Sequence, residues 1–354
     1  MDTAALLYER LANQQIAAAA MKQPKDVVSY MVAMQAQEYG SAKWAIGLRA
    51  ATLTAAAVEV AFNKGSILRT HVLRPTWHFV APADIRWLLR LSAPRVHGFN
   101  AYMYRKLSLD AKLFARSNDV IAKSLEGGKH LTRATLVENL QHARIPAEGV
   151  ALACILMYAE LEGIICSGPR EGKQHTYALL DERVPKRGET YEHDEALGQL
   201  AIRYFTSRAP ATVKDFAWWA GLSAKDAKSA VAMLPDSFKQ VTQDGQEYIT
   251  TAIAAAKKRQ IQDTFLMPNF DEYGISYKDR DIMKSDKEVH APVSKNGVAN
   301  PSLVVNGQIA GTWKAITKKN LTTVETSTYH TMSKAQELAI KKAKERYCSF
   351  ADNQ

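Results

Sequence analysis

The chain of 354 residues contains little cysteine, with only Cys154, Cys166 and Cys348. None of them forms a C-x-x-C pair or belongs to a cluster of His and Cys, so the sequence argues against both a structural zinc site and a disulfide framework. We therefore expect a protein of a reducing compartment, the cytoplasm, that needs no metal and no other cofactor.

Long apolar runs are also missing. No run reaches the roughly 18 residues of a membrane-spanning helix. The N-terminal segment carries Asp2, Glu9 and Arg10, where a signal peptide would have a basic and then an apolar stretch. We expect no membrane partner. Hydrophobic residues make up 47% of the chain, which is enough for real cores, and the length predicts two or three packed units.

Acidic residues are fewer than basic ones. There are 36 Asp and Glu against 46 Lys and Arg, a formal net charge of +10, and the pI is about 9.3. This balance says nothing about the fold, but it favours a polyanionic partner, of which nucleic acid is the commonest. A membrane surface is the weaker alternative.

A helix followed directly by a hairpin is the first clear pattern. Leu53–Lys64 has apolar residues at helical spacing, with Thr52 or Thr54 as the N-cap. Ser66–Val80 is rich in β-branched and aromatic residues around a central proline, which predicts two strands joined by a tight turn. This order is typical of a winged-helix DNA-binding unit.

The alternation of the hairpin predicts which side chains face inward. We expect Trp77 and Phe79 to be core residues, and Arg74 and His78 to share the outer face. Arg69, Arg74 and His78 are suited to phosphates and bases. The helix Leu53–Lys64 is poor in Arg, Asn and Gln, so we expect binding through DNA shape and backbone rather than base reading.

The pattern of helices followed by a hairpin recurs twice more, and strands then dominate from Gln260. Residues 131–180 give two helices and a hairpin, and residues 196–250 give three helices and a hairpin that turns at Asp244-Gly245. We predict an α+β fold with three tandem winged-helix units and a C-terminal α+β domain, C-shaped with a concave basic surface. The expected domains are residues 1–120, 121–190, 191–258 and 259–354.

Four sequence blocks resemble one known family, the AlkZ-type DNA glycosylases, which are tandem winged-helix proteins. The blocks occur in the family's order and are Gln35-Ala36-Gln37, Leu73–Val80, Met267–Tyr273 with Tyr277–Arg280, and Val305–Lys314. Within that family a Gln-x-Gln motif marks the AlkZ-like branch and Gln-x-Asp its sister branch. The present chain carries the first, and the resemblance implies that Gln35 and Gln37 are the catalytic pair.

The residues themselves set a condition on this pair. Residues i and i+2 of a helix point about 200° apart, so Gln35 and Gln37 can face one target only if the helix ends near Met34–Gln37. A Gln amide is a poor general base, but it can hold a water and aim its carbonyl dipole at a developing cation. From spacing alone, a helix-end hydrogen-bonding role is the better interpretation, and the resemblance reverses that preference.

A second charged cluster contains Asp271 and Glu272, followed by Lys278 and Arg280. A carboxylate activates water better than an amide, so Asp271 is the rival candidate for the chemistry. A structural ion-pair network is the favoured interpretation of the two acids. Lys278 and Arg280 are expected to reach DNA phosphates.

We therefore expect a monofunctional DNA glycosylase that hydrolyses the N-glycosidic bond of N7-alkylated, bulky or cross-linked purines. Its partner would be double-stranded DNA with alkylated bases, and the chain, which has no dimerisation heptad, is predicted to be a monomer. The alternatives are a non-enzymatic winged-helix regulator and an enzyme that uses Asp271. The predicted DNA-binding residues are Lys43, Arg49, Arg69, Arg74, His78, Lys278 and Arg280.

Overall fold

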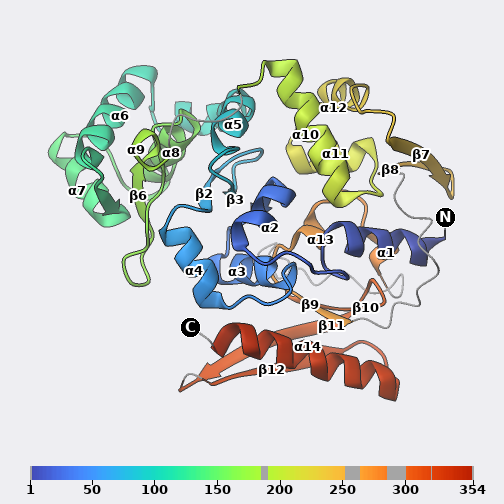
Figure 1. Ribbon diagram of the computed structural model, residues 1–354. Coiled ribbons are helices and arrows are strands. Elements are labelled where there is room, and N and C mark those ends of the chain that lie inside the picture. The colour runs from blue at the N-terminus through green and yellow to red at the C-terminus, as the bar shows by residue number, and fades with distance from the viewer. Residues whose placement is uncertain (1, 185–189, 252–263, 285–299, 320, 353–354) are drawn as a thin grey trace. The chain divides into compact units, whose positions relative to one another are not determined.

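The chain forms a mixed α+β fold with small antiparallel sheets (Figure 1). A computed structural model describes residues 2–184, 190–251, 264–284, 300–319 and 321–352. The residues form two compact units, Met1–Glu59 with Leu197–Gln354, and Val60–Ala196. Within the described ranges, no helix combines the length and the apolar character needed to cross a membrane.

The first unit begins with helices that side-chain caps fix at their N-termini. Asp2 accepts a hydrogen bond from the Ala5 amide at 2.7 Å, and Glu38 accepts from the Gly40 and Ser41 amides. Such caps satisfy amides that have no partner within the helix. The elements are α1 (Thr3–Asn13), α2 (Pro24–Met31), β1 (Ala33–Gln35), α3 (Tyr39–Leu48) and α4 (Ala55–Asn63), which the unit boundary crosses.

The same unit continues with three helices and a hairpin, as the sequence predicts. Thr212 and Ser223 are the N-caps of the second and third of these helices, and the turn at Asp244-Gly245 has positive φ at both residues, as a type I′ turn requires. The elements are α10 (His193–Arg208), α11 (Val213–Ala220), α12 (Ala224–Val231), β7 (Phe238–Gln243) and β8 (Gln246–Thr251). Their fully buried aromatic core consists of Tyr204, Phe205, Phe216 and Trp219.

A four-stranded antiparallel sheet with strand order β12-β11-β10-β9 completes the first unit. Helix α14 lies along this sheet (Figure 1), and the indole N–H groups of Trp44 and Trp313 donate to the carbonyls of Leu266 and Met267 at 2.7 and 2.8 Å. The elements are β9 (Thr264–Met267), α13 (Glu272–Ile275), the 3-10 turn Asp281–Met283, β10 (Ser302–Val305), β11 (Gln308–Lys318), β12 (Leu321–Thr328) and α14 (Lys334–Asp352).

The second unit contains the first predicted hairpin. Strands β2 and β3 pair antiparallel, with Arg69 opposite Phe79 and His71 opposite Trp77. A three-stranded sheet of order β4-β6-β5 and four long helices follow. The elements are β2 (Leu68–His71), β3 (Trp77–Val80), α5 (Ile85–Lys106), α6 (Ala111–Leu125), β4 (His130–Thr132), α7 (Arg133–His142), α8 (Gly149–Leu161), β5 (Ile165–Ser167), β6 (Thr176–Leu179) and α9 (Leu180–Arg183).

The division of the second unit differs from the predicted domains. The β2–β3 hairpin packs beside β5, where the Arg69 amide donates to Ser167 Oγ at 2.8 Å. The boundary predicted at residues 120–121 lies inside α6, and the boundary predicted at 258–259 lies outside the described residues. The division into three winged-helix units and a C-terminal domain remains a prediction.

The capping box of α11 gives a direct test of local stability. Thr212 Oγ1 accepts from the Asp215 amide at 3.0 Å, and Asp215 Oδ2 accepts from the Thr212 amide at 2.9 Å. Thr212→Ala should lower the free energy of unfolding by about 1 kcal/mol, measured by urea denaturation. Thr212→Ser keeps the hydroxyl, so its free energy of unfolding should fall much less. If both variants lost the same stability, the effect would come from the methyl group and not from the cap.

Candidate active site

The segment before the glutamine pair begins with a strained turn. Helix α2 ends at Met31, and Val32 has φ 66° and ψ −58°. A β-branched residue seldom adopts positive φ, and this conformation is costly unless its surroundings enforce it. The chain then becomes extended through β1, Ala33–Gln35. The sequence predicted that the helix must end near Met34–Gln37; α2 ends three residues before Met34, at Met31, so the glutamine pair lies outside the helix.

Gln35 and Gln37 are the accessible residues of the segment that follows Val32. Met34 and Ala36 are buried, whereas Gln35 is half-buried and Gln37 is exposed. Strand β1 ends at Gln35, and Gln37 lies in the bend that follows it. The two neutral amides each offer a donor and an acceptor there. They can hold a water and direct a dipole, but they cannot take up a proton at neutral pH.

A buried ion pair lies against this strand. Arg208 donates from Nη1 to the Met31 carbonyl at 3.0 Å and from Nη2 to the Ala33 carbonyl at 2.9 Å. The same Nη2 pairs with Glu272 Oε2 at 2.8 Å. Glu272 Oε1 in turn accepts from the Gln35 amide at 2.9 Å. One ion pair thus holds the backbone on both sides of Val32 and at Gln35.

Glu272 remains ionised because its surroundings offset the cost of burial. Burial alone would raise its pKa, but the Arg208 guanidinium and the hydrogen bonds from Ser276, Arg208 and the Gln35 amide lower the pKa to about 2. The Trp219 indole also donates to Oε2, at 2.9 Å. The carboxylate is therefore a fixed acceptor for backbone and side-chain donors.

The rival carboxylate, Asp271, is part of a second buried ion pair. Arg49 donates to both of its oxygens at 2.8 Å, and the Tyr273 amide donates to Oδ1 at 2.8 Å. Arg49 itself is fully buried and also binds Gln14. This agrees with the structural interpretation of the acid. It also argues against a phosphate-binding role for Arg49, whose donors lie in the interior.

The other predicted DNA-binding residues of the first unit are placed differently. Lys43 forms an ion pair with Glu59 at 2.9 Å. Lys278 has an exposed side chain, while its backbone amide donates to Asp215 at 2.8 Å. Arg280 is half-buried, and burial lowers the pKa of its guanidinium. Of these three residues, only Lys278 is exposed and also has no ion pair in the described part of the chain.

In the β2–β3 hairpin of the second unit, the side chains of β3 are buried differently from the prediction. Phe79 is buried as expected, but His78 is also fully buried and Trp77 is the partly exposed residue. The prediction that His78 faces solvent is therefore wrong. The Arg69 guanidinium is buried and stacks 4.2 Å above the Trp77 ring. Arg74 lies half-buried in the turn after Leu73, which has φ 63°.

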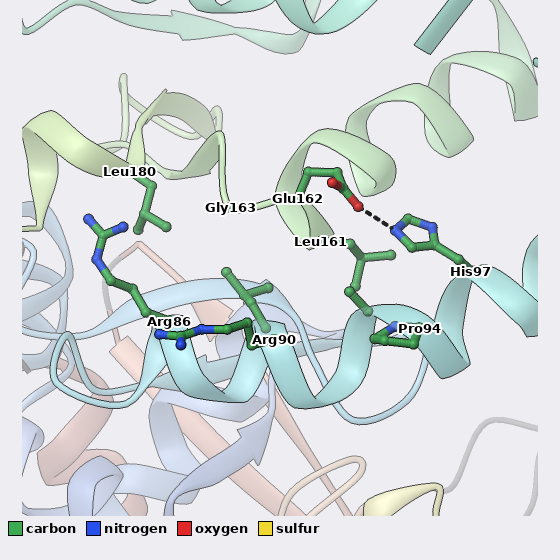
Figure 2. A pocket seen from close by; sticks show the side chains of 10 residues that line it. Arg86, Arg90, Pro94, His97, Leu161, Glu162, Gly163 and Leu180 are labelled. Carbon is green, nitrogen blue, oxygen red and sulfur yellow. Dashed lines mark hydrogen bonds and ion pairs between the residues drawn. The ribbon is translucent and has the colours of Figure 1, made fainter. Parts of the chain in front are cut away.

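The second unit also contains a cavity of about 410 Å³ beside α5. Arg86 and Arg90 extend along one side of it, and the His97 Nε2 forms a hydrogen bond with the Glu162 carboxylate, which accepts, at 3.0 Å (Figure 2). Arg86 pairs with Asp181 at 2.9 Å. The sequence prediction missed this site, although one signal exists: α5 contains five Lys and Arg residues and no Asp or Glu.

Arg208 is the other residue that the sequence prediction missed. It has no motif around it, and only the tertiary structure brings it to the strand of Gln35. Among the residues that the structure describes, no group of three or more His, Cys, Asp or Glu side chains is placed to hold a metal ion.

Comparison with known proteins identifies the family. The model of a family described as DNA glycosylase AlkZ-like matches residues 28–350, so the chain belongs to the AlkZ-like DNA glycosylases. Membership in this family implies a DNA substrate.

A curated relative and a solved structure are similar over most of the chain. An interstrand DNA cross-link repair glycosylase of Streptomyces sahachiroi is 23% identical over 311 residues, covering 84% of each protein. The structure of the DNA glycosylase AlkZ from Streptomyces sahachiroi matches with a TM-score of 0.84 and 20% identity, covering 99% of this chain and 97% of that one. At this identity the structural match establishes the shared fold.

The low pKa of Glu272 predicts a pH-dependent stability. A carboxylate whose pKa falls from near 4.5 to about 2 on folding stabilises the protein above pH 4.5, and this contribution is lost as the pH falls toward 2. The shift corresponds to about 3 kcal/mol. The free energies of unfolding of the wild type and of Glu272→Gln, measured in urea, should therefore differ by about this amount less at pH 2 than at pH 5. The exposed-site control Glu337→Gln should show no such convergence, and a constant difference for Glu272→Gln would contradict the assignment.

Proposed function

We propose that the chain is a monofunctional DNA glycosylase of the Gln-x-Gln branch, with tandem winged-helix units. It would hydrolyse the N-glycosidic bond of N7-alkylated purines, including bulky or cross-linked ones, and leave an abasic site. The observation that carries this proposal is the accessibility of both Gln35 and Gln37, between buried neighbours, on a non-helical segment that an ion pair holds at the Gln35 amide.

The chemistry of the substrate suits two amides. An N7-alkylguanine is already cationic, so the C1′–N9 bond can break without protonation of the base, and its electron pair neutralises the departing purine. The sugar becomes oxocarbenium-like, and a water adds its oxygen to C1′ and releases a proton to solvent. Gln37, with Gln35, would orient that water and stabilise the sugar cation through amide carbonyl dipoles.

A non-enzymatic winged-helix regulator is the alternative. Helix α4 supports the glycosylase instead, because its sequence AAAVEVAFN offers few groups that read bases in the major groove. A regulator would bind a palindromic site as a dimer and release no base.

The test measures base release from an oligonucleotide that carries a single N7-methylguanine. Gln37→Ala should lower the single-turnover rate on the order of 100-fold, because the water loses its acceptor, while the affinity for the same DNA changes little. Gln246→Ala, an exposed glutamine on β8, is the matched control and should behave as the wild type.

Two results would overturn the proposal. Base release that survives in the Gln35→Ala/Gln37→Ala double variant would move the chemistry elsewhere in the chain. If the wild type releases no base even from a bulkier adduct or a cross-link, the enzyme proposal fails.

A further inference from the structure

We infer that the Arg208–Glu272 ion pair is a positioning device for the glutamine strand. This inference rests on the proposed role of Gln35 and Gln37. Neither charged group reaches solvent, since both are almost fully buried. Both groups bind backbone atoms of the glutamine strand: Arg208 donates to the Met31 and Ala33 carbonyls, and Glu272 accepts from the Gln35 amide.

The geometry at Val32 explains why such a device is needed. The backbone turns there with φ 66°, a conformation that a β-branched side chain disfavours. Arg208 offsets this cost because it donates hydrogen bonds to the carbonyls on either side of the turn. If the turn relaxed, the register of β1 would change, and a shift of one residue exchanges the accessible and buried faces of a strand. Gln35 and Gln37 would then turn inward.

The chain provides a matched comparison at the next residue. Asp271 and Glu272 are adjacent, both are buried, and each binds an arginine. Only Glu272 contacts the glutamine strand. In Glu272→Gln, one oxygen becomes an NH2 group, which must face either the donors from Arg208, Trp219 and Ser276 or the Gln35 amide. In Asp271→Asn the corresponding conflict lies at Arg49, away from β1.

Glu272→Gln should lower single-turnover base release on the order of 10- to 100-fold, because small misplacements of a reacting group have effects of this size. DNA affinity should stay within about threefold of wild type. Asp271→Asn, assayed at a temperature where both variants are folded by circular dichroism, should release base within about threefold of the wild-type rate. Adding Val32→Gly to Glu272→Gln should restore part of the lost rate, since glycine adopts positive φ without strain.

Hydrogen exchange separates this inference from the proposed function. The peptide that contains the Gln35 amide should exchange faster in Glu272→Gln than in Asp271→Asn, whether or not base is released. Equal exchange in the two variants, or base release by Glu272→Gln at the wild-type rate, would overturn the inference. If the wild type releases no base, the proposed function fails, while the exchange result still decides whether the pair holds the strand.

A separate observation concerns helix α5 in the second unit. Its sequence holds five cations and no carboxylate over 22 residues, a length of about 33 Å. Two aromatic side chains on it are largely exposed, Phe99 at 75% and Tyr102 at 66%. Aromatic rings between cations are typical of surfaces that stack bases and bind phosphates.

The charges around α5 favour a polyanion. Arg86 and His97 have acidic partners, Asp181 and Glu162. The Arg90 guanidinium beside the cavity, in contrast, has no ion-pair or hydrogen-bond partner among the described residues. Arg105 and Lys106 are exposed in the last turn of the helix. We propose that α5 is a DNA-contact surface, where Arg90 and Arg105 bind backbone phosphates and Tyr102 and Phe99 stack against bases.

Salt dependence tests this surface without any need for base release. The binding constant K is measured by fluorescence anisotropy with a duplex that contains a short single-stranded gap. Log K falls as log salt rises, and Arg90→Gln/Arg105→Gln should make this slope less steep by about 2. Tyr102→Ala should weaken binding about 5- to 100-fold at constant slope. Lys225→Gln/Lys228→Gln on exposed positions of α12 is the charge-matched control. An unchanged slope in the arginine variant would overturn the proposal and leave the exposed aromatics as a surface for a protein partner.

Discussion

The buried pair of Arg208 and Glu272 is the constraint on which the candidate active site depends. Removing two charges from water is costly, and an apolar pair of similar volume is often at least as stable. What the pair adds is direction: an arginine fork and a carboxylate bind three backbone atoms within five residues of chain. The strain at Val32 persists because these bonds define the turn. Stability and geometry of the strand are therefore set by the same interaction.

The neutral character of the accessible side follows from this arrangement. The two adjacent buried carboxylates Asp271 and Glu272 are both held by arginines, so neither is available as a general base. Gln35 and Gln37 are the accessible amides of this segment, and the neighbouring Glu38 uses its carboxylate to cap helix α3. Two amides can assist only a leaving group that departs without protonation, and the proposed N7-alkylpurine substrate has this property because it is cationic.

Local signals in the sequence predicted most of the secondary structure. Thr212 and Ser223 mark helix starts, and the Asp244-Gly245 turn marks a hairpin, because each depends on neighbours within a few residues. The short strand β1 and the single-turn helix α13 were missed, since tertiary contacts define both. The prediction that His78 faces solvent was wrong because β3 is buried on both faces from His78 to Val80; alternation gives the period of a strand but does not show that one of its faces is open.

The arginines show the same limit of sequence-based prediction, because their type alone does not reveal what they bind. Positive charge on a DNA glycosylase suggests phosphate contacts, yet Arg49 and Arg208 are interior residues that bind carboxylates and backbone carbonyls. Arginine serves both purposes because its planar fork suits carboxylates and phosphates alike. The absence of acids is a better guide than the presence of bases. Helix α5 contains no carboxylate, but its Arg86 still pairs with Asp181 from another element. Arg90 and Arg105 have no ion-pair partner among the described residues, which leaves their charge for the proposed DNA contact.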